Sequence, residues 1–129
     1  MKKMLLLFSH NLTPEQIYEA EKNLSAKEFL TLPDALQSLW SQVPPEGEIN
    51  DTVRLFIEGI NNHGTKGDIA LIQGEFGMTF AVADWCHRHE ITPVYSTTRR
   101  EYEQTEEDGR IVNRHVFKHV RFREYKRFI

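Results

Sequence analysis

Two short apolar runs with no polar interruption constrain the fold more than any other feature of the sequence. They are Met4–Phe8 and Ile69–Ile72. A strand with one solvated face alternates apolar and polar residues, whereas a parallel strand covered on both faces is apolar throughout. The two runs therefore predict buried strands in a small Rossmann-like α/β domain, a parallel sheet with helices on both faces.

Helix-like segments separate the strand-like ones. We predict strands at residues 4–8, 28–32, 68–73 and 91–95, and helices at residues 13–24, 33–43, 51–63 and 79–89. Thr13, Pro14 and Gln16 form a capping-box signature at the first helix start, and Asp51 is the expected cap of the third helix. Four aromatic residues fall at helical spacing among aliphatic ones and are expected in the core: Trp40, Phe56, Phe80 and Trp85.

The pattern changes after Arg100. Asp108-Gly109 lies between two extended runs, Glu101–Thr105 and Ile111–Phe122, and this is a strong signal for an antiparallel β-hairpin. The alternation of the second run slips between Val116 and Phe117. We therefore expect a bulge there, or leave the faces of that strand unassigned.

Length and composition fit one domain covering residues 1–129. A 15.2 kDa chain buries about two-thirds of its unfolded surface, which is enough for a core without metal or disulfide. With 40% hydrophobic and 27% charged residues, the chain is neither disordered nor fibrous. Cys86 is the single cysteine, and no apolar run is long enough for a membrane span or is followed by a cleavage signature. We expect a cytoplasmic protein with no membrane partner.

Charge is unevenly distributed. Residues 110–129 hold seven Lys or Arg and one acid, against nine basic and eighteen acidic residues in the rest of the chain. A basic end on an acidic body favours an anionic partner. The alternative is a solvated edge strand, because Lys and Arg also discourage edge pairing.

Three polar loops follow predicted strands, at the edge of an open α/β sheet where ligands bind. They are Ser9–Asn11, Gly74–Gly77 and Thr97–Arg100, and we expect them to converge on one cleft. Glycines before a helix suit an anion, although a tight turn that needs glycine dihedrals explains them equally well.

The other two loops carry titratable and cationic groups. Arg99 and Arg100 suit phosphate, or alternatively pair with Glu101 or Glu103. His10 could act as an acid or base, or could only cap the following helix.

A metal site is not expected. Cys86, His87 and His89 do not share one helix face, and they lack the spacing of zinc ligands. His115 and His119 would share a strand face if no bulge intervened. We expect them to line a ligand or partner surface, with a metal site as the alternative.

Read together, these segments resemble a known family. They are Leu7–Thr13, Leu32-Pro33, Leu39–Ser41, Leu71–Gly77, Pro93–Arg99 and His119–Arg123. Their order resembles the small stand-alone CRISPR-associated proteins of the Csx "twenty" type. These are single-domain relatives of the CARF sensors that accompany type III CRISPR systems, and the resemblance covers nearly the whole chain.

The resemblance implies a ring nuclease. Such a protein binds cyclic oligoadenylate, with cyclic tetra-adenylate the expected ring, and linearises it to switch off type III CRISPR signalling. The ribose 2′-hydroxyl beside each phosphodiester is the nucleophile. Cleavage therefore needs no metal or other cofactor, only in-line positioning and charge stabilisation. The product would be linear oligoadenylate ending in a 2′,3′-cyclic phosphate.

Two residues are the expected catalytic groups: His10 would take the 2′ proton, and Arg99 would stabilise charge on phosphorus. The expected ligand-binding residues come from the same loops and the basic end: Ser9, Asn11, Gln73, Gly74, Glu75, Phe76, Gly77, Thr97, Thr98, Arg100 and Arg123. The ring has rotational symmetry, so we expect a two-fold homodimer around it.

Three other functions fit the same residues. A messenger sponge or sensor would use this pocket without turnover. A nucleic-acid-binding accessory protein would use the basic end and lose affinity steeply with salt, but the loops offer only Phe76 for stacking. The ring-nuclease prediction itself requires no long nucleic acid. A nucleotide-processing enzyme that binds metal through His115 and His119 would be inhibited by a chelator.

Overall fold

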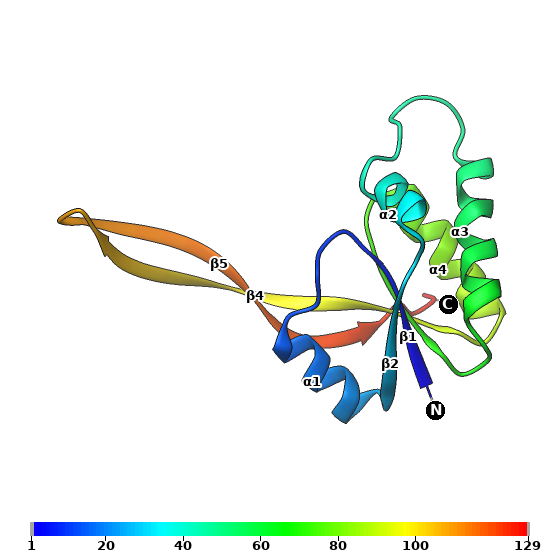
Figure 1. The fold of residues 1–129 in the computed structure, drawn as a ribbon, viewed down its shortest axis with the longest axis horizontal. Helices are drawn as coiled ribbons and strands as arrows, with labels where there is room; N and C mark the ends of the chain where they lie inside the picture. Colours follow the sequence, from blue (N-terminus) through cyan, green and yellow to red (C-terminus); the bar gives the residue numbers. More distant parts are fainter. Residues whose placement is uncertain (1, 129) are drawn as a thin grey trace.

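The computed structural model describes residues 2–128 and consists of five strands and four helices (Figure 1). In chain order these are β1 (Lys2–Phe8), α1 (Pro14–Asn23), β2 (Ala26–Thr31), α2 (Asp34–Ser41), α3 (Asn50–His63), β3 (Ile69–Gln73), α4 (Phe76–Arg88), β4 (Thr92–Glu107) and β5 (Arg110–Glu124). Among residues 2–128, no helix combines the length and apolar composition needed to cross a bilayer.

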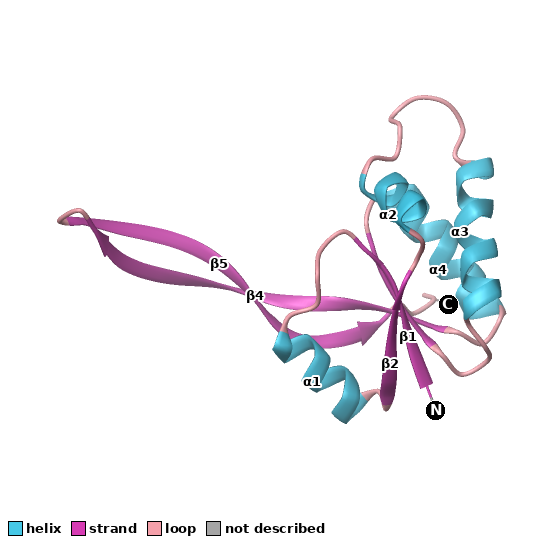
Figure 2. Cartoon of the chain, viewed as in Figure 1, coloured by secondary structure: helices cyan, strands magenta, loops and turns pink. Residues whose placement is uncertain are grey.

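The strands lie together in one sheet (Figure 2), and their order across it is β2-β1-β3-β4-β5. Neighbouring strands from β2 to β4 are parallel, and β5 pairs with β4 in the antiparallel sense. The chain leaves β1 toward β2 and later returns to the other side of β1 as β3. The chain connections therefore run toward one edge of the sheet before β3 and toward the other edge from β3 onward. This reversal makes the carboxyl ends of β1 and β3 the switch point of the sheet.

Helices cover both faces of the sheet, as predicted. Leu5 and Leu7 of β1 belong to a core shared with α2, α3 and α4, which includes Phe56 and Ile72. The intervening residues Met4, Leu6 and Phe8 belong to a second core under α1, with Val94 and Phe122 among its members. Successive side chains of a strand point to opposite faces. The Met4–Phe8 run is therefore apolar throughout because both of its faces are buried.

Helix starts depend on local capping, and two of them differ from prediction. The Thr13 hydroxyl accepts from the Gln16 N–H at 3.2 Å and Gln16 Oε1 accepts from the Thr13 N–H at 2.9 Å, so the predicted capping box is confirmed. The prediction for Asp51 is wrong: Ile49 is the N-cap of α3, and Asp51 lies in the first turn, paired with Arg54. Helix α4 begins at Phe76, three residues before the predicted start, because the Glu75 side chain caps it.

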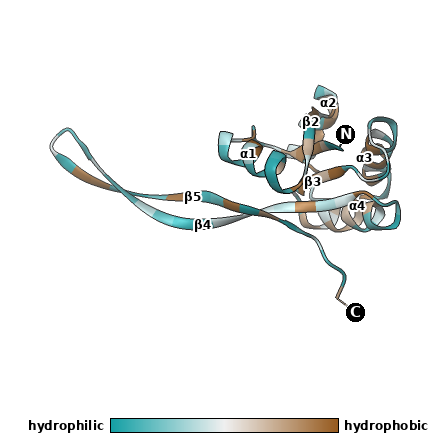
Figure 3. Cartoon of the chain, turned by 90° about the horizontal axis from the view of Figure 1, so that it is seen from below, coloured by the Kyte–Doolittle hydropathy of each residue, from teal (hydrophilic) through white to brown (hydrophobic). Residues whose placement is uncertain are grey.

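Strand β4 differs most from prediction. The segment Ser96–Arg100, predicted to be a loop, continues β4, which pairs with β5 as far as Glu107. Because β3 pairs with β4 only up to Val94, the outer part of β4 pairs, within residues 2–128, with β5 alone. The pair leaves the body of the protein as a two-stranded ribbon with few apolar residues (Figures 1 and 3). A strand exposed on both faces has no apolar pattern, so the sequence looked like a loop.

The hairpin turn lies where predicted, and the bulge does not. Asp108 and Gly109 adopt φ values of 50° and 74°, as a two-residue hairpin turn requires. The pairing shifts at a different place from the predicted Val116–Phe117 step. Thr97 pairs with Arg121 and Thr98 with His119, which leaves Val120 as the extra residue.

Candidate functional site

Helix α2 joins the carboxyl ends of the two central strands at the switch point. The Trp40 indole N–H donates to the Gln73 carbonyl at the end of β3, at 2.9 Å. One turn earlier, the Gln37 amide donates to the Phe8 carbonyl at the end of β1, at 3.1 Å. Ser41 also bonds to Ser9 through their hydroxyl oxygens, at 3.1 Å. Side chains of α2 therefore fill the crevice between these strands and fix their separation.

Two hollows lie beside these contacts of α2, which we call the α2 bridge. A hollow of 260 Å³ beside the end of β1 is lined by Ser9, His10 and Asn11. A larger groove of 960 Å³ lies against α4 and is lined in part by Gln73 and Gly74. His10 and Gly74, which we expected in one cleft, therefore line different hollows. Arg99 lines neither of them, because it lies on the ribbon.

The turn between β3 and α4 differs from the predicted anion cradle. The Glu75 carboxylate accepts from the Met78 N–H at 2.9 Å, so a negative charge already occupies the N-terminus of α4. Neither Gly74 nor Gly77 has a positive φ, so the explanation of these glycines by their dihedrals is wrong. At Gly74 the reason is space, since a Cβ would come within 2.6 Å of Trp40 Nε1.

The close approach of Trp40 to Gly74 predicts that one methyl group added at Gly74 destabilises the protein. Gly74→Ala should lower the free energy of unfolding by about 1–3 kcal/mol, because the buried Trp40 ring must move. Displacement of the ring also weakens its bond to Gln73, so the tryptophan emission spectrum should shift. Urea titration and fluorescence measure both effects. Gly47→Ala is a poor control because Gly47 has a φ of 82°. Ser38→Ala, on the exposed side of α2, should leave both quantities unchanged.

Aromatic side chains dominate the larger groove. The rings of Phe76 and Phe80 are 93% and 77% exposed, so the prediction of Phe80 as a core residue is wrong. Tyr95 and Tyr125 lie beside each other with ring centroids 4.7 Å apart. Burial raises the pKa of Tyr125 to about 12, and its hydroxyl donates to the Ile72 carbonyl at 2.6 Å. The groove therefore offers exposed rings around a fixed, neutral phenol.

A row of cations leads from this groove onto the ribbon. Directly opposite residues of an antiparallel pair share a face, as do alternate residues along one strand. Three such pairs follow one another on the face of Tyr95: Tyr95 with Arg123, Thr97 with Arg121, and Arg99 with Lys118. We call Arg99, Lys118, Arg121 and Arg123 the basic row. At its inner end the Arg123 guanidinium lies over the Tyr95 ring, 5.9 Å from the centroid.

Arg99 and Lys118 lie opposite each other with like charge, which is unfavourable unless an anion lies between them. Lys118 forms a long ion pair with Glu101, at 3.7 Å. Arg99 has no ion pair within residues 2–128. The alternative in which Arg99 pairs with Glu101 or Glu103 is therefore not found. Thr98 and Arg100 point to the opposite face, where Arg100 donates to His115 Nδ1 at 2.8 Å. The predicted Thr97–Arg100 cluster is therefore divided between two faces.

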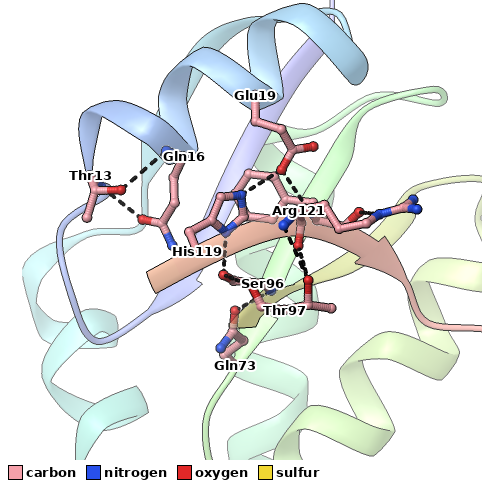
Figure 4. A network of polar contacts seen from close by, with 9 residues as sticks. Thr13, Gln16, Glu19, Gln73, Ser96, Thr97, His119 and Arg121 are labelled. Atoms are coloured by element: carbon pink, nitrogen blue, oxygen red, sulfur yellow. Dashed lines mark hydrogen bonds and ion pairs between the residues drawn. The ribbon is translucent and has the colours of Figure 1, made fainter. Parts of the chain in front are cut away.

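A buried polar network lies on that opposite face, under α1 (Figure 4). The Ser96 hydroxyl lies 2.5 Å from His119 Nδ1, and His119 Nε2 lies 2.6 Å from Glu19 Oε1. The backbone N–H of Ser96 donates to Gln73 Oε1 at 2.7 Å, which connects the network to the end of β3. Ser96 and Glu19 were not predicted as site residues, since a lone serine and a lone helical glutamate carry no motif.

The possible metal ligands of the described residues do not gather into a cluster. Among residues 2–128, no three His, Cys, Asp or Glu side chains are placed to hold a metal ion together. Cys86 is fully buried, and burial raises the pKa of its thiol to about 12, so it stays protonated. His115 and His119 share a strand face, because the bulge lies beyond them, but each is bonded to different partners.

Comparison with known proteins shows the family. Residues 2–123 match the family described as "Uncharacterized protein MJ1673 family". The chain is 43% identical over 126 residues to "Uncharacterized protein MJ1673" of Methanocaldococcus jannaschii, covering 97% of this chain and 98% of that one. No solved structure matches the chain. The chain therefore belongs to the MJ1673 family.

Proposed function

We propose that the protein is a ring nuclease that binds cyclic oligoadenylate and linearises it, with cyclic tetra-adenylate as its ring. One observation carries the proposal: an open groove with exposed aromatic rings continues, on the same sheet face, into the basic row. A cyclic oligoadenylate presents flat bases and a phosphate between each pair of them. Aromatic rings stack on bases, and guanidinium groups bind phosphates through paired hydrogen bonds.

The roles of the residues follow from their positions. In this proposal Phe76 and Tyr95 stack on adenine, since Phe76 is exposed and both rings line the groove. Arg99 and Arg123 would hold phosphate oxygens along the basic row. The Glu75 carboxylate at the start of α4 repels phosphate, so we assign the phosphates to these cations and not to the Gln73–Gly77 turn.

The reaction needs no metal or cofactor in this proposal. The ring carries its own nucleophile, a ribose 2′-hydroxyl, which must be turned in line with the leaving 5′ oxygen. Arg99 would stabilise the extra charge on the phosphoryl oxygens as the bond to the 2′ oxygen forms. His10 lies in the smaller hollow and does not line the groove, so within one chain it is not placed to take the 2′ proton.

A homodimer is part of the proposal. A ring with rotational symmetry has equivalent phosphates on opposite sides, and a two-fold axis through it would present one basic row to each half. The mass of the particle in solution should therefore be that of two chains, at least when the ring is bound. Light scattering with and without cyclic tetra-adenylate measures it.

The turnover experiment separates enzyme from sponge. We expect a large excess of cyclic tetra-adenylate to be converted, with or without EDTA, to linear product ending in a 2′,3′-cyclic phosphate. Chromatography with mass spectrometry identifies it. Ring that is bound at full occupancy but remains intact would establish a messenger sponge instead. Absence of binding, together with salt-sensitive binding of linear RNA, would replace the proposal with a nucleic-acid-binding function.

A further inference from the structure

We propose that Ser96, His119 and Glu19 form a proton-transfer relay, with the Ser96 hydroxyl as the group that takes the 2′ proton of the bound ring. The inference rests on the proposed function for its substrate. It does not depend on that function for the relay itself, which the geometry of three elements defines. Ser96 belongs to β4, His119 to β5 and Glu19 to α1.

The distances suit one arrangement of the imidazole. An ionised Glu19 accepts from His119 Nε2 across 2.6 Å. In a neutral ring Nδ1 is then an acceptor, and the proposal takes the Ser96 hydroxyl, 2.5 Å away, as its donor. Glu19 Oε1 also accepts from the Phe122 N–H at 2.6 Å, which fixes the carboxylate in turn. This is the order hydroxyl, imidazole, carboxylate that activates serine in unrelated enzymes.

The His119 imidazole is the enclosed centre of the relay. Its side chain is 5% exposed and that of Glu19 is 13% exposed, and Ser96 as a residue is half-buried. The imidazole is therefore largely shielded from water, with the Ser96 hydroxyl on one side of it and the Glu19 carboxylate on the other.

The bulge at Val120 turns the His119 side chain toward Ser96. Phe122 is paired with Ser96, so the two side chains lie on the same face of the sheet. In a regular strand every second residue lies on that face, so Val120 would lie there and the His119 side chain would lie on the opposite face. The extra residue returns His119 to the face of Ser96 and α1. Bulges of this kind turn side chains next to active sites. If the network only held α1 against β5, the bond between His119 and Glu19 would suffice, and the Ser96 hydroxyl would not be needed.

The relay adjoins the groove along β4. Ser96 lies between Tyr95, which lines the groove, and Thr97, which lies in line with the basic row, but its own side chain is on the α1 face and lines neither hollow. Past Val94 the β4 strand no longer pairs with β3, and at Ser96 the Gln73 side chain accepts the backbone N–H. The proposed step therefore requires a ring that lies across this edge of β4, with bases in the groove and one phosphate on the side of Ser96.

In the proposed step the 2′ proton leaves through Ser96 and His119. The 2′ oxygen forms a bond to phosphorus as its proton moves to Ser96 Oγ, and the Ser96 proton moves to His119 Nδ1. The bond between phosphorus and the 5′ oxygen breaks, and its electron pair stays on that oxygen. The leaving oxygen, on the opposite side of phosphorus, takes a proton from water, and His119 returns its proton to solvent through the Ser96 hydroxyl. The products are a 2′,3′-cyclic phosphate and a 5′-hydroxyl, with the relay restored.

A first experiment tests the relay without any adenylate. Diisopropyl fluorophosphate should form one adduct on Ser96, as the serine oxygen displaces fluoride and its proton passes to His119. Peptide mass spectrometry should locate the adduct, Ser96→Ala should abolish it, and His119→Gln should slow it about tenfold or more. The matched controls Ser38→Ala and His63→Gln, both exposed, should be labelled like the wild type.

A second experiment tests the relay in the reaction. Single-turnover cleavage of cyclic tetra-adenylate by Ser96→Ala and His119→Gln should be slower by about 10²–10⁴-fold, with binding unchanged. Circular dichroism checks folding. Ser96→Ala removes a single oxygen and stays informative should His119→Gln fail to fold.

The outcomes separate the two proposals. Folded wild type with no adduct on Ser96, or His119→Gln labelled at the wild-type rate, overturns the relay. Labelling through His119 in a protein that leaves the ring intact overturns the ring nuclease and leaves the relay standing. Cleavage by Ser96→Ala at the wild-type rate overturns the relay as proton acceptor and leaves the ring nuclease standing.

Discussion

Replacing Arg99 with alanine should weaken the binding of cyclic tetra-adenylate by about ten- to a hundredfold. A hydrogen bond to a charged group contributes about 1.5–3 kcal/mol, and each 1.4 kcal/mol is about a factor of ten in affinity. Arg99 is exposed, lies opposite Lys118, and has no ion pair within residues 2–128 to compensate for its charge. Calorimetric titration at fixed ionic strength measures the affinity, since surface electrostatics weaken with salt.

Arg110→Ala is the matched control for this prediction. Arg110 has the same side chain and lies at the tip of the same ribbon, far along it from the groove. Both variants lose one positive charge, so a general effect of net charge would lower both affinities equally. Equal affinities of Arg99→Ala and wild type would remove Arg99 from the binding site and with it the outer part of the basic row.

Replacing Phe56 with alanine should lower the free energy of unfolding by about 3–5 kcal/mol. Phe56 is fully buried in the core between the sheet and α2–α4, and its ring meets Trp40 edge-on with centroids 5.0 Å apart. A typical domain has a total stability of about 5–15 kcal/mol, so this loss brings the protein close to unfolding at ambient temperature. Urea denaturation followed by circular dichroism measures it.

Leu55→Ala, at the neighbouring position of α3, separates burial from helix propensity. Leu55 is 44% exposed, so its truncation should cost about 1 kcal/mol or less. Similar losses in the two variants would mean that Phe56 is not enclosed as described. The Phe56 variant should also weaken the indole bond to Gln73, because the ring that supports Trp40 is missing.

Features fixed by neighbouring residues could be predicted from the sequence. The capping box at Thr13 and the turn at Asp108-Gly109 involve side chains or dihedrals only a few residues apart, and both are confirmed. The run Met4–Phe8 predicted a strand buried on both faces because only such a strand tolerates five apolar residues in sequence. The β2 strand begins two residues before its predicted start, at Ala26, within the usual uncertainty of element boundaries.

The candidate site depends on contacts between distant residues, which local patterns do not contain. Gly74 is required by Trp40, and the aim of His119 is set by an extra residue in its strand. Glu19 and His119 are 100 positions apart, so neither could be recognised without the fold. The outer part of β4 lacked apolar alternation because both of its faces are solvated, and its residues were therefore predicted to converge with loops that lie elsewhere.

The α2 bridge, which joins the ends of β1 and β3, has a consequence for the affinity of a ligand bound at this edge of the sheet. Gln37 and Trp40 hold the ends of β1 and β3 in place before any ligand arrives. Ordering a flexible segment on association subtracts from the observed affinity, whereas a preorganised surface avoids that entropic penalty. Adenylate capture at this edge should therefore leave the backbone of Phe8 and Gln73 where it already lies, and adaptation should be confined to side-chain rotamers.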